Sequence, residues 1–207
     1  QPDIGQTILV VFSWAVLIFT SGINIFFLFG LSIFGFILLT YLIMYVPKFD
    51  YIQSRILSFF NRDTGSHNFQ SDKAIESITS GGYFGKGIGE GTLKNRVPEA
   101  HTDYIISVIS EEFGVVAIIL ILLLFLIFTY MVFKKISYEK NDKIKLVLIG
   151  CVSLILMQAT IHIGVNIRLF PTTGMTLPFL SYGGSSIVSI SILSGIILNL
   201  TKRKIEN

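Results

Sequence analysis

The chain has 207 residues, of which 52% are apolar and only 14% are charged, and its mean hydropathy is +0.71. A soluble domain carries about a quarter charged residues, so this composition excludes an ordinary soluble protein and predicts a membrane protein. The net charge of +3 is modest, and we expect no nucleic-acid partner. The single cysteine, Cys151, cannot form a disulfide within the chain. The chain opens at Gln1 without Met or a basic leader, which we interpret as the middle of a longer chain.

The first apolar run covers residues 8–46 almost without charge, which is too long for one membrane span of about 20 residues. A break at residues 21–24 predicts two helices, over about 7–20 and 24–46. Residues 47–103 then form a polar loop with both signs of charge. Apolar spacing within the loop predicts an amphipathic helix over 51–60 and a second short helix over 71–79, with Ser71 as its cap.

Three more apolar runs follow, and they predict helices over about 104–133, 146–166 and 186–200. The 134–145 loop and the C-terminal tail are rich in lysine, so the positive-inside rule places both in the cytoplasm. Residues 47–103 and 167–185 then form extracytoplasmic loops. The expected fold is a single, all-α, polytopic membrane domain with about five transmembrane helices.

Six glycines stand among residues 81–91, which predicts a backbone that turns often or approaches another group closely. The segment lacks the spacing and the hydroxyl residue of a phosphate loop, so nucleotide binding is excluded. Its N–H groups remain candidates to meet a lipid pyrophosphate, with Lys86, Lys94 and Arg96 as nearby cations.

A group of polar residues stands where the long loop meets the third apolar run: Glu99, His101, Thr102 and Asp103. A helix over 103–133 would be about 46 Å long, against a hydrocarbon thickness of about 30 Å. We therefore expect its first ten residues to stand above the bilayer or to line a wet cavity. A polar stripe descends along this part, made of Asp103, Ser107, Ser110, Glu111 and Gly114.

Several interpretations of these residues are open. Asp103 is either a helix cap or, with Thr102 as the cap, a carboxylate available for chemistry. Glu111 and Glu112 are candidates to pair with a Lys or Arg on another helix, and His101 is more often an ordinary loop histidine than a ligand. No His, Asp and Glu set has metal-ligand spacing, so we expect no metal site built from the protein alone. The irregular 171–186 stretch, with two prolines and three glycines, is either a plain turn or the lining of a cavity.

Five motifs resemble those of the SEDS family (shape, elongation, division and sporulation) and occur in the family's order: QPDIG at 1–5, GGYFGKGIG at 81–89, PEAHTDYI at 98–105, EEFG at 111–114 and PFLSYGGSS at 178–186. The stretches at 164–166 and 176–178 look more like the division-type members than the elongation type. His162 departs from the division-type pattern, which usually has Asn there. It either titrates near neutral pH or donates one hydrogen bond, and we favour the second.

The resemblance implies a ten-helix protein of the bacterial cytoplasmic (inner) membrane, of which this chain would be roughly the last five helices, with a cytoplasmic C-terminus. The absence of the early helices would leave the chain inactive by itself. The resemblance further implies polymerisation of lipid II into glycan strands on the outer face during cell division. The implied partners are a class B penicillin-binding protein and other division proteins of the membrane.

The family's essential aspartate maps to Asp103, the implied general base on an acceptor sugar hydroxyl. A divalent cation, Mg²⁺ or Mn²⁺, is a candidate cofactor. The implied substrate-binding residues are Glu99, His101, Thr102, Lys86, Lys94, Arg96, Ser181, Gly183, Gly184 and Ser185. Two alternatives to the enzyme are a lipid II flippase that uses the polar stripe as its path, and a non-catalytic scaffold for the penicillin-binding protein.

Overall fold

The computed structural model describes residues 3–60, 66–91 and 100–202. The elements in chain order are α1 (Ile4–Thr20), α2 (Ile25–Tyr45), the 3-10 turn η1 (Pro47–Phe49), α3 (Asp50–Phe60), α4 (Ser66–Gly81), α5 (Ile105–Tyr138), α6 (Asp142–Asn166) and α7 (Gly184–Thr201). The described ranges contain helices and no strand. By length and composition α2, α5, α6 and α7 can each cross a membrane, and α1 is apolar but shorter. The expected all-α polytopic fold class is confirmed.

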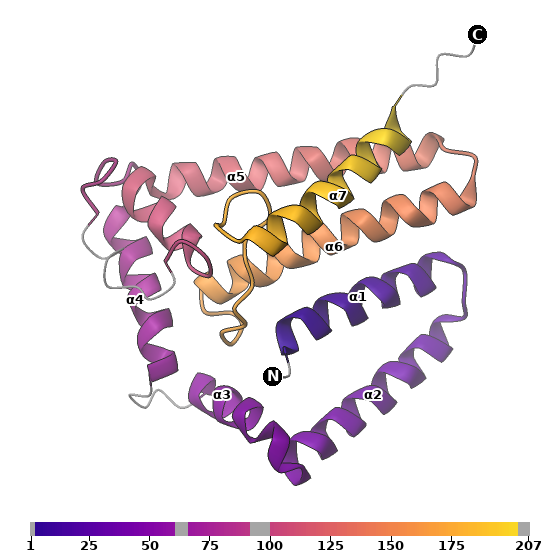
Figure 1. The fold of residues 1–207 in the computed structure, drawn as a ribbon, viewed down its shortest axis with the longest axis horizontal. Helices are drawn as coiled ribbons and strands as arrows, with labels where there is room; N and C mark the ends of the chain where they lie inside the picture. The colour runs from indigo at the N-terminus through magenta and orange to yellow at the C-terminus, as the bar shows by residue number, and fades with distance from the viewer. Residues whose placement is uncertain (1–2, 61–65, 92–99, 203–207) are drawn as a thin grey trace.

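The two ends of the helix bundle carry different elements (Figure 1). Helices α5, α6 and α7 lie alongside one another, and α1 packs on α6. The α5–α6 turn, the α1–α2 turn and the last turn of α7 lie at one end. Helices α3 and α4 and the irregular connection between α6 and α7 lie at the other end. Both lysine-rich segments therefore adjoin the same end of the bundle, as the positive-inside topology requires.

Helix α2 diverges from the other long helices and buries none of its residues against the described chain (Figure 1). Its 21 residues contain no charged side chain. A helix that is apolar on every side is stable only in apolar surroundings. Its side chains therefore need to face lipid acyl chains or other apolar helices.

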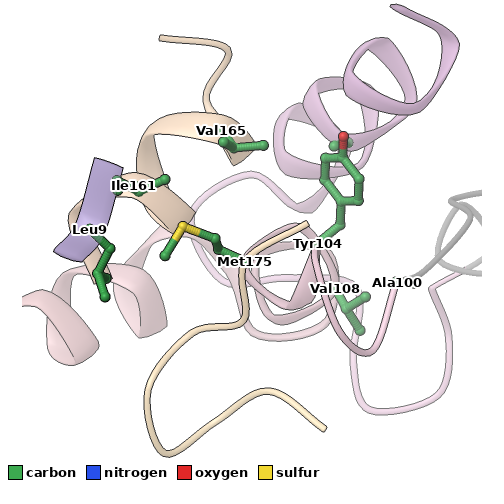
Figure 2. Packing of buried hydrophobic residues seen from close by; sticks show 8 residues of the cluster. Leu9, Ala100, Tyr104, Val108, Ile161, Val165 and Met175 are labelled. Atoms are coloured by element: carbon green, nitrogen blue, oxygen red, sulfur yellow. The ribbon is translucent and has the colours of Figure 1, made fainter. Parts of the chain in front are cut away.

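Three clusters of buried apolar side chains lie in the described part of the chain, and the two larger ones join α1, α4, α5, α6 and α7. The first joins α5, α6 and α7: Val132, Ile136, Leu148, Cys151, Val152, Ile155, Ile190 and Ile197. The second lies around the start of α5, where α1, α4, α6 and the α6–α7 connection meet: Leu9, Ala74, Ala100, Tyr104, Val108, Ile161, Val165 and Met175 (Figure 2). The second cluster fixes the start of α5 against four other parts of the chain.

Some helix bounds differ from those that the hydropathy pattern indicates. Helix α4 begins at Ser66, so Ser71, the expected cap, lies inside the helix and is buried. Helix α6 begins at Asp142 rather than near 146, because Asn141 caps it by accepting the N–H of Lys143 at 3.0 Å. In both cases the helix begins with a polar turn, which a search for apolar residues does not predict.

Helix α5 is broken at Gly114, where φ is 77° and ψ is −178°. The expectation of one continuous helix over 104–133 is therefore wrong, and α5 consists of a short segment (residues 105–113) and a long one (residues 115–138). Glycine adopts a positive φ at little cost, whereas a residue with a Cβ does not. The short segment carries the polar stripe, and the long segment is the apolar membrane span.

The glycine loop (residues 82–89) supplies backbone hydrogen bonds that the break removes from α5. Two of its N–H groups donate to the last carbonyls of the short segment, and two of its carbonyls accept from the first N–H groups of the long segment. The four bonds are Lys86 N to Glu111 O (2.9 Å), Gly87 N to Glu112 O (3.0 Å), Val115 N to Gly82 O (3.0 Å) and Val116 N to Tyr83 O (3.3 Å). The loop thus caps both faces of the break.

Glycine is needed here because two stretches of backbone touch. A Cβ on Gly85 would lie 2.1 Å from Glu112 O, and one on Gly114 would lie 2.2 Å from Tyr83 O. The alternative expectation, that the N–H groups of this loop meet a lipid pyrophosphate, is wrong for Lys86 and Gly87, since helix carbonyls already accept them.

The polar stripe on the short segment faces α4 instead of an open cavity. Ser107, Ser110 and Glu111 are each 0% exposed. The Ser77 hydroxyl lies 3.2 Å from both Ser107 O and Glu111 Oε2. A Cβ on Gly81 would lie 1.9 Å from Ser110 O, so the end of α4 touches the backbone of α5. The expectation of a wet stripe is wrong for these residues because α4 covers them.

Candidate active site

A pocket of about 180 Å³ lies at the start of α5, at the end of the bundle opposite the lysine-rich turn (Figure 1). Five parts of the chain line it: α3, α4, the start of α5, the end of α6 and the α6–α7 connection. The lining residues are Arg55, Gln70, Asp103, Tyr104, Val165, Thr172, Gly174 and Met175. Figure 2 shows Tyr104, Val165 and Met175 lying together in the apolar cluster at this place. The lining therefore combines apolar side chains with polar ones, among them one carboxylate and one guanidinium.

Asp103 is half-buried in this lining, just before α5 begins. The N-cap position of α5 belongs to Tyr104, whose side chain makes no capping hydrogen bond. The Asp103 carboxylate lies close to Gly174, where an added Cβ would be 3.6 Å from Oδ2. Gly174 has a φ of +71°, which a residue with a Cβ adopts only at a cost. A side chain at this position would be in contact with the carboxylate.

Arg55 is the residue of this pocket that sequence reasoning missed. It comes from α3, and its Nη1 donates to Thr172 O at 2.9 Å across the pocket. A single arginine on an amphipathic helix beside a membrane carries no signal that separates a site residue from a surface one. Its place in the same pocket as Asp103 depends on how α3 packs against the α6–α7 connection, which local sequence patterns do not encode.

Tyr104 lies near both of these charges. Burial raises the pKa of its phenol above the usual range, the Asp103 carboxylate raises it further, and Arg55 opposes the shift. The phenol therefore stays protonated at neutral pH. It contributes a neutral, rigid side of the pocket, with its ring in the apolar cluster.

The backbone that carries Asp103 is held by three consecutive hydrogen bonds to its carbonyls. The three donors come from the end of α6 and from the turn before α7. They are Tyr182 N to His101 O (3.0 Å), Ser181 Oγ to Thr102 O (2.8 Å) and Asn166 Nδ2 to Asp103 O (3.0 Å). The loop before α5 is therefore fixed although it has no regular secondary structure.

The residues of the PFLSYGGSS motif lie next to the Asp103 loop and outside the pocket lining. Ser181 is buried, and its hydroxyl accepts from Leu177 N and donates to Thr102 O, both at 2.8 Å. Gly183 is the N-cap of α7, and Gly184 and Ser185 are exposed residues of its first turn. Ser181 thus orders the loop that bears Asp103, while a direct role for the motif in substrate binding stays a prediction.

The other predicted substrate-binding residues are distributed differently. The His101 side chain is exposed, and Thr102 is half-buried. Lys86 lies on the glycine loop, where its Nζ is 3.4 Å from Oε1 of the buried Glu111. The expectation that Glu111 pairs with a cation is met by this contact, although Lys86 comes from a loop and not from a helix. Glu99, Lys94 and Arg96 lie outside the described residues.

The described pocket residues do not fit a divalent cation. Such an ion takes several oxygen ligands, mostly carboxylates. The lining offers one carboxylate, Asp103, and also contains the Arg55 guanidinium. The described part of the chain contains no cluster of three His, Cys, Asp or Glu residues elsewhere. We therefore derive no chemical step through a metal ion.

Comparison with known proteins gives one consistent family. The family model described as "Cell cycle protein", of FtsW, RodA and SpoVE, matches residues 1–206. The probable peptidoglycan glycosyltransferase FtsW of Caulobacter vibrioides (strain NA1000 / CB15N) is 36% identical over 99% of this chain and 51% of its own length. The corresponding protein of Enterococcus hirae is 32% identical over 100% and 55%. Stage V sporulation protein E of Bacillus subtilis (strain 168) is 35% identical over 98% and 55%. The chain thus spans about half the length of these relatives.

The fold is similar to that of a solved structure described as "Structural coordination of polymerization and crosslinking by a peptidoglycan synthase complex". The TM-score is 0.79 at 26% sequence identity, over 97% of this chain and 56% of that chain. The family match covers the pocket together with every motif that carries the resemblance. The chain therefore belongs to the FtsW/RodA/SpoVE family of cell cycle proteins, which is the SEDS family, and it is a multi-pass membrane protein.

Proposed function

We propose that this protein is a peptidoglycan glycosyltransferase that polymerises lipid II into glycan strands during cell division, with Asp103 as its general base. The observation that supports this most is the position of the Asp103 carboxylate. It is half-buried, lines an open pocket and shares that pocket with a guanidinium. The relatives named as peptidoglycan glycosyltransferases support the same activity, although this chain spans about half of each.

The chemistry requires little beyond one well-placed carboxylate. The acceptor's sugar hydroxyl is a poor nucleophile until it loses its proton, and Asp103 takes that proton as the oxygen attacks the anomeric carbon of the donor. The bond from that carbon to the pyrophosphate oxygen breaks, and undecaprenyl pyrophosphate leaves with the electron pair. A positioned general base contributes about 10²–10⁴-fold to such a step. Holding two lipid-anchored substrates in line at the membrane surface supplies much of the remaining acceleration.

Arg55 is the cation that the described pocket offers to the departing pyrophosphate. A guanidinium is planar and binds phosphate oxygens through two parallel N–H donors. Its charge lies where negative charge develops as the bond to the anomeric carbon breaks. In this proposal Asp103 acts on the acceptor and Arg55 acts on the leaving group.

Arg55→Lys is expected to lower kcat for lipid II polymerisation by roughly 10-fold or more, because an ammonium keeps the charge but loses the two-pronged geometry. Steady-state rates with purified complete protein measure the effect. Arg168→Lys is the matched control, since Arg168 pairs with the exposed Asp72 on α4 and does not line the pocket. Equal rates for Arg55→Lys and the control would remove Arg55 from the mechanism.

The main alternative, a lipid II flippase, needs an open polar path along α5. Ser107, Ser110 and Glu111 lie covered by α4 instead, which favours the enzyme.

A direct test of the flippase alternative uses the complete protein in detergent solution, where no bilayer remains to be crossed. We expect glycan strands to lengthen from lipid II, with products separated by gel electrophoresis. Lipid II movement across vesicle membranes without any strand product would favour the flippase.

The remaining parts of the proposal concern the setting of the enzyme. We infer that it resides in the bacterial cytoplasmic membrane, with the pocket on the outer face and the lysine-rich turn and the C-terminus in the cytoplasm. A class B penicillin-binding protein and other division proteins are the proposed partners. The related structure, which its description calls a peptidoglycan synthase complex, supports such an assembly. A Mg²⁺ or Mn²⁺ ion remains a proposed cofactor only with oxygen ligands from the substrate.

A further inference from the structure

Three polar side chains lie one helical turn apart on α6. Two of them face the irregular α6–α7 connection, and the third faces the loop before α5. Each donates a hydrogen bond to a backbone carbonyl outside a helix. The bonds are Gln158 Nε2 to Thr176 O (2.9 Å), His162 Nδ1 to Met175 O (2.7 Å) and Asn166 Nδ2 to Asp103 O (3.0 Å). We call Gln158, His162 and Asn166 the α6 ladder. At 1.5 Å per residue the ladder extends about 12 Å along one face of α6.

Two members of the ladder are fully buried. His162 is 1% exposed and Asn166 is 0% exposed. The connection between α6 and α7 has no helix to satisfy its carbonyls, and an unsatisfied buried carbonyl is costly. The His162 bond fixes its carbonyl most strongly, because both partners are buried and the alternative is to leave a polar group unpaired away from water. Gln158, Thr176 and Asp103 are half-buried.

The contact of His162 also defines its tautomer. Met175 O can only accept a hydrogen bond, so the nitrogen that faces it at 2.7 Å must carry the proton. His162 thus acts through one donor, Nδ1–H. An asparagine places its Nδ2 at nearly the same distance from the backbone as Nδ1 of histidine, whereas leucine offers no donor.

The ladder connects both sides of the pocket to a single rigid helix. Met175, held by His162, lines the pocket, and so does the adjacent Gly174, which lies beside Asp103 Oδ2. Asp103 itself is held through its carbonyl by Asn166. We propose that the α6 ladder consists of positioning residues, which set the distance between the catalytic carboxylate and the wall that confines the acceptor sugar.

This inference rests on the proposed glycosyltransferase activity, so its test includes a readout that needs no activity. In the complete protein, His162→Leu is expected to lower kcat by about 10- to 100-fold while KM changes little, since a misplacement of about 1 Å costs this much. His162→Asn, which keeps the donor, is expected to remain within a few-fold of wild type. Thr160→Val is the control, because Thr160 is exposed and its hydroxyl donates to Leu156 O of its own helix.

Hydrogen exchange of the peptide that covers residues 172–182 provides the second readout. We expect faster exchange there in His162→Leu than in His162→Asn, with no change in peptides from the α5–α6–α7 core. A wild-type kcat in His162→Leu, an equal loss of kcat in both variants, or a lower unfolding temperature with unchanged kcat would each overturn the positioning role. If the wild-type protein makes no glycan, the proposed function fails, whereas the exchange difference still tests whether the ladder holds the connection.

Discussion

Asp103→Asn is expected to lower lipid II polymerisation by about 10²–10⁴-fold, which is the contribution of a positioned general base. Asparagine has nearly the same shape as aspartate but cannot take a proton from the acceptor hydroxyl at neutral pH. The carbonyl of residue 103, which accepts from Asn166, is unchanged by the substitution, so the loop should keep its position. Rates are measured with radiolabelled lipid II and the complete protein, at equal membrane abundance.

Glu76→Gln is the matched control for this prediction. Glu76 is an exposed carboxylate on α4 that forms a surface pair with Lys73 of the same helix. Surface pairs of this kind contribute at most about 1 kcal/mol to stability. We expect the control to polymerise at the wild-type rate. Wild-type activity in Asp103→Asn would instead support a non-catalytic scaffold that recruits the transpeptidase.

Gly85→Ala is expected to prevent the break in α5 from forming as it does in the wild type. The new Cβ would lie 2.1 Å from Glu112 O and 2.5 Å from Phe113 N, and both of these are backbone atoms that cannot move aside. The glycine loop would have to leave the break, and the carbonyls of Glu111 and Glu112 would lose their partners. We expect a severe loss of folded protein, measured as membrane abundance and as the unfolding temperature in detergent.

Gly89→Ala separates this steric effect from backbone strain. Gly89 has a φ of +83°, close to the +78° of Gly85, but a Cβ at Gly89 would have open space of 4 Å around it. Both variants therefore carry the same cost of about 1–2 kcal/mol for a left-handed alanine. Only Gly85→Ala adds the backbone collision. If the two variants were equally stable, the glycine loop would not pack into the break.

The long helices could be predicted from apolar run lengths alone, because membrane hydrocarbon requires about 20 apolar residues per span. The break in α5 could not be predicted in this way. Gly114 stands in a helix-like pattern, and an isolated glycine is tolerated inside helices. Its positive φ becomes favourable only because the glycine loop, which comes much earlier in the chain, replaces the missing hydrogen bonds. That compensation is a long-range contact, which periodicity does not reveal.

The candidate site likewise contains a residue that the sequence predicts and others that only the structure identifies. The motif identifies Asp103, and the structure brings this residue into a pocket. The role of Arg55 depends on the fold of α3, and the polar stripe is dry because α4 covers it, so neither could be inferred from local patterns. The four-residue spacing of Gln158, His162 and Asn166 is visible in the sequence. The carbonyls that they bind are not, because two lie in an irregular connection and the third lies in a loop 63 residues before Asn166.

The central claim is that the Asp103 carboxylate meets the acceptor sugar. The most direct measurement is a structure of the complete protein with a lipid-linked acceptor bound. We expect the reacting hydroxyl oxygen within about 2.6–3.2 Å of an Asp103 carboxylate oxygen, which is the range for proton transfer, and the phosphates on the Arg55 side of the pocket. An acceptor bound with its hydroxyl at another carboxylate, and with both Asp103 oxygens turned to backbone amides, would contradict the account.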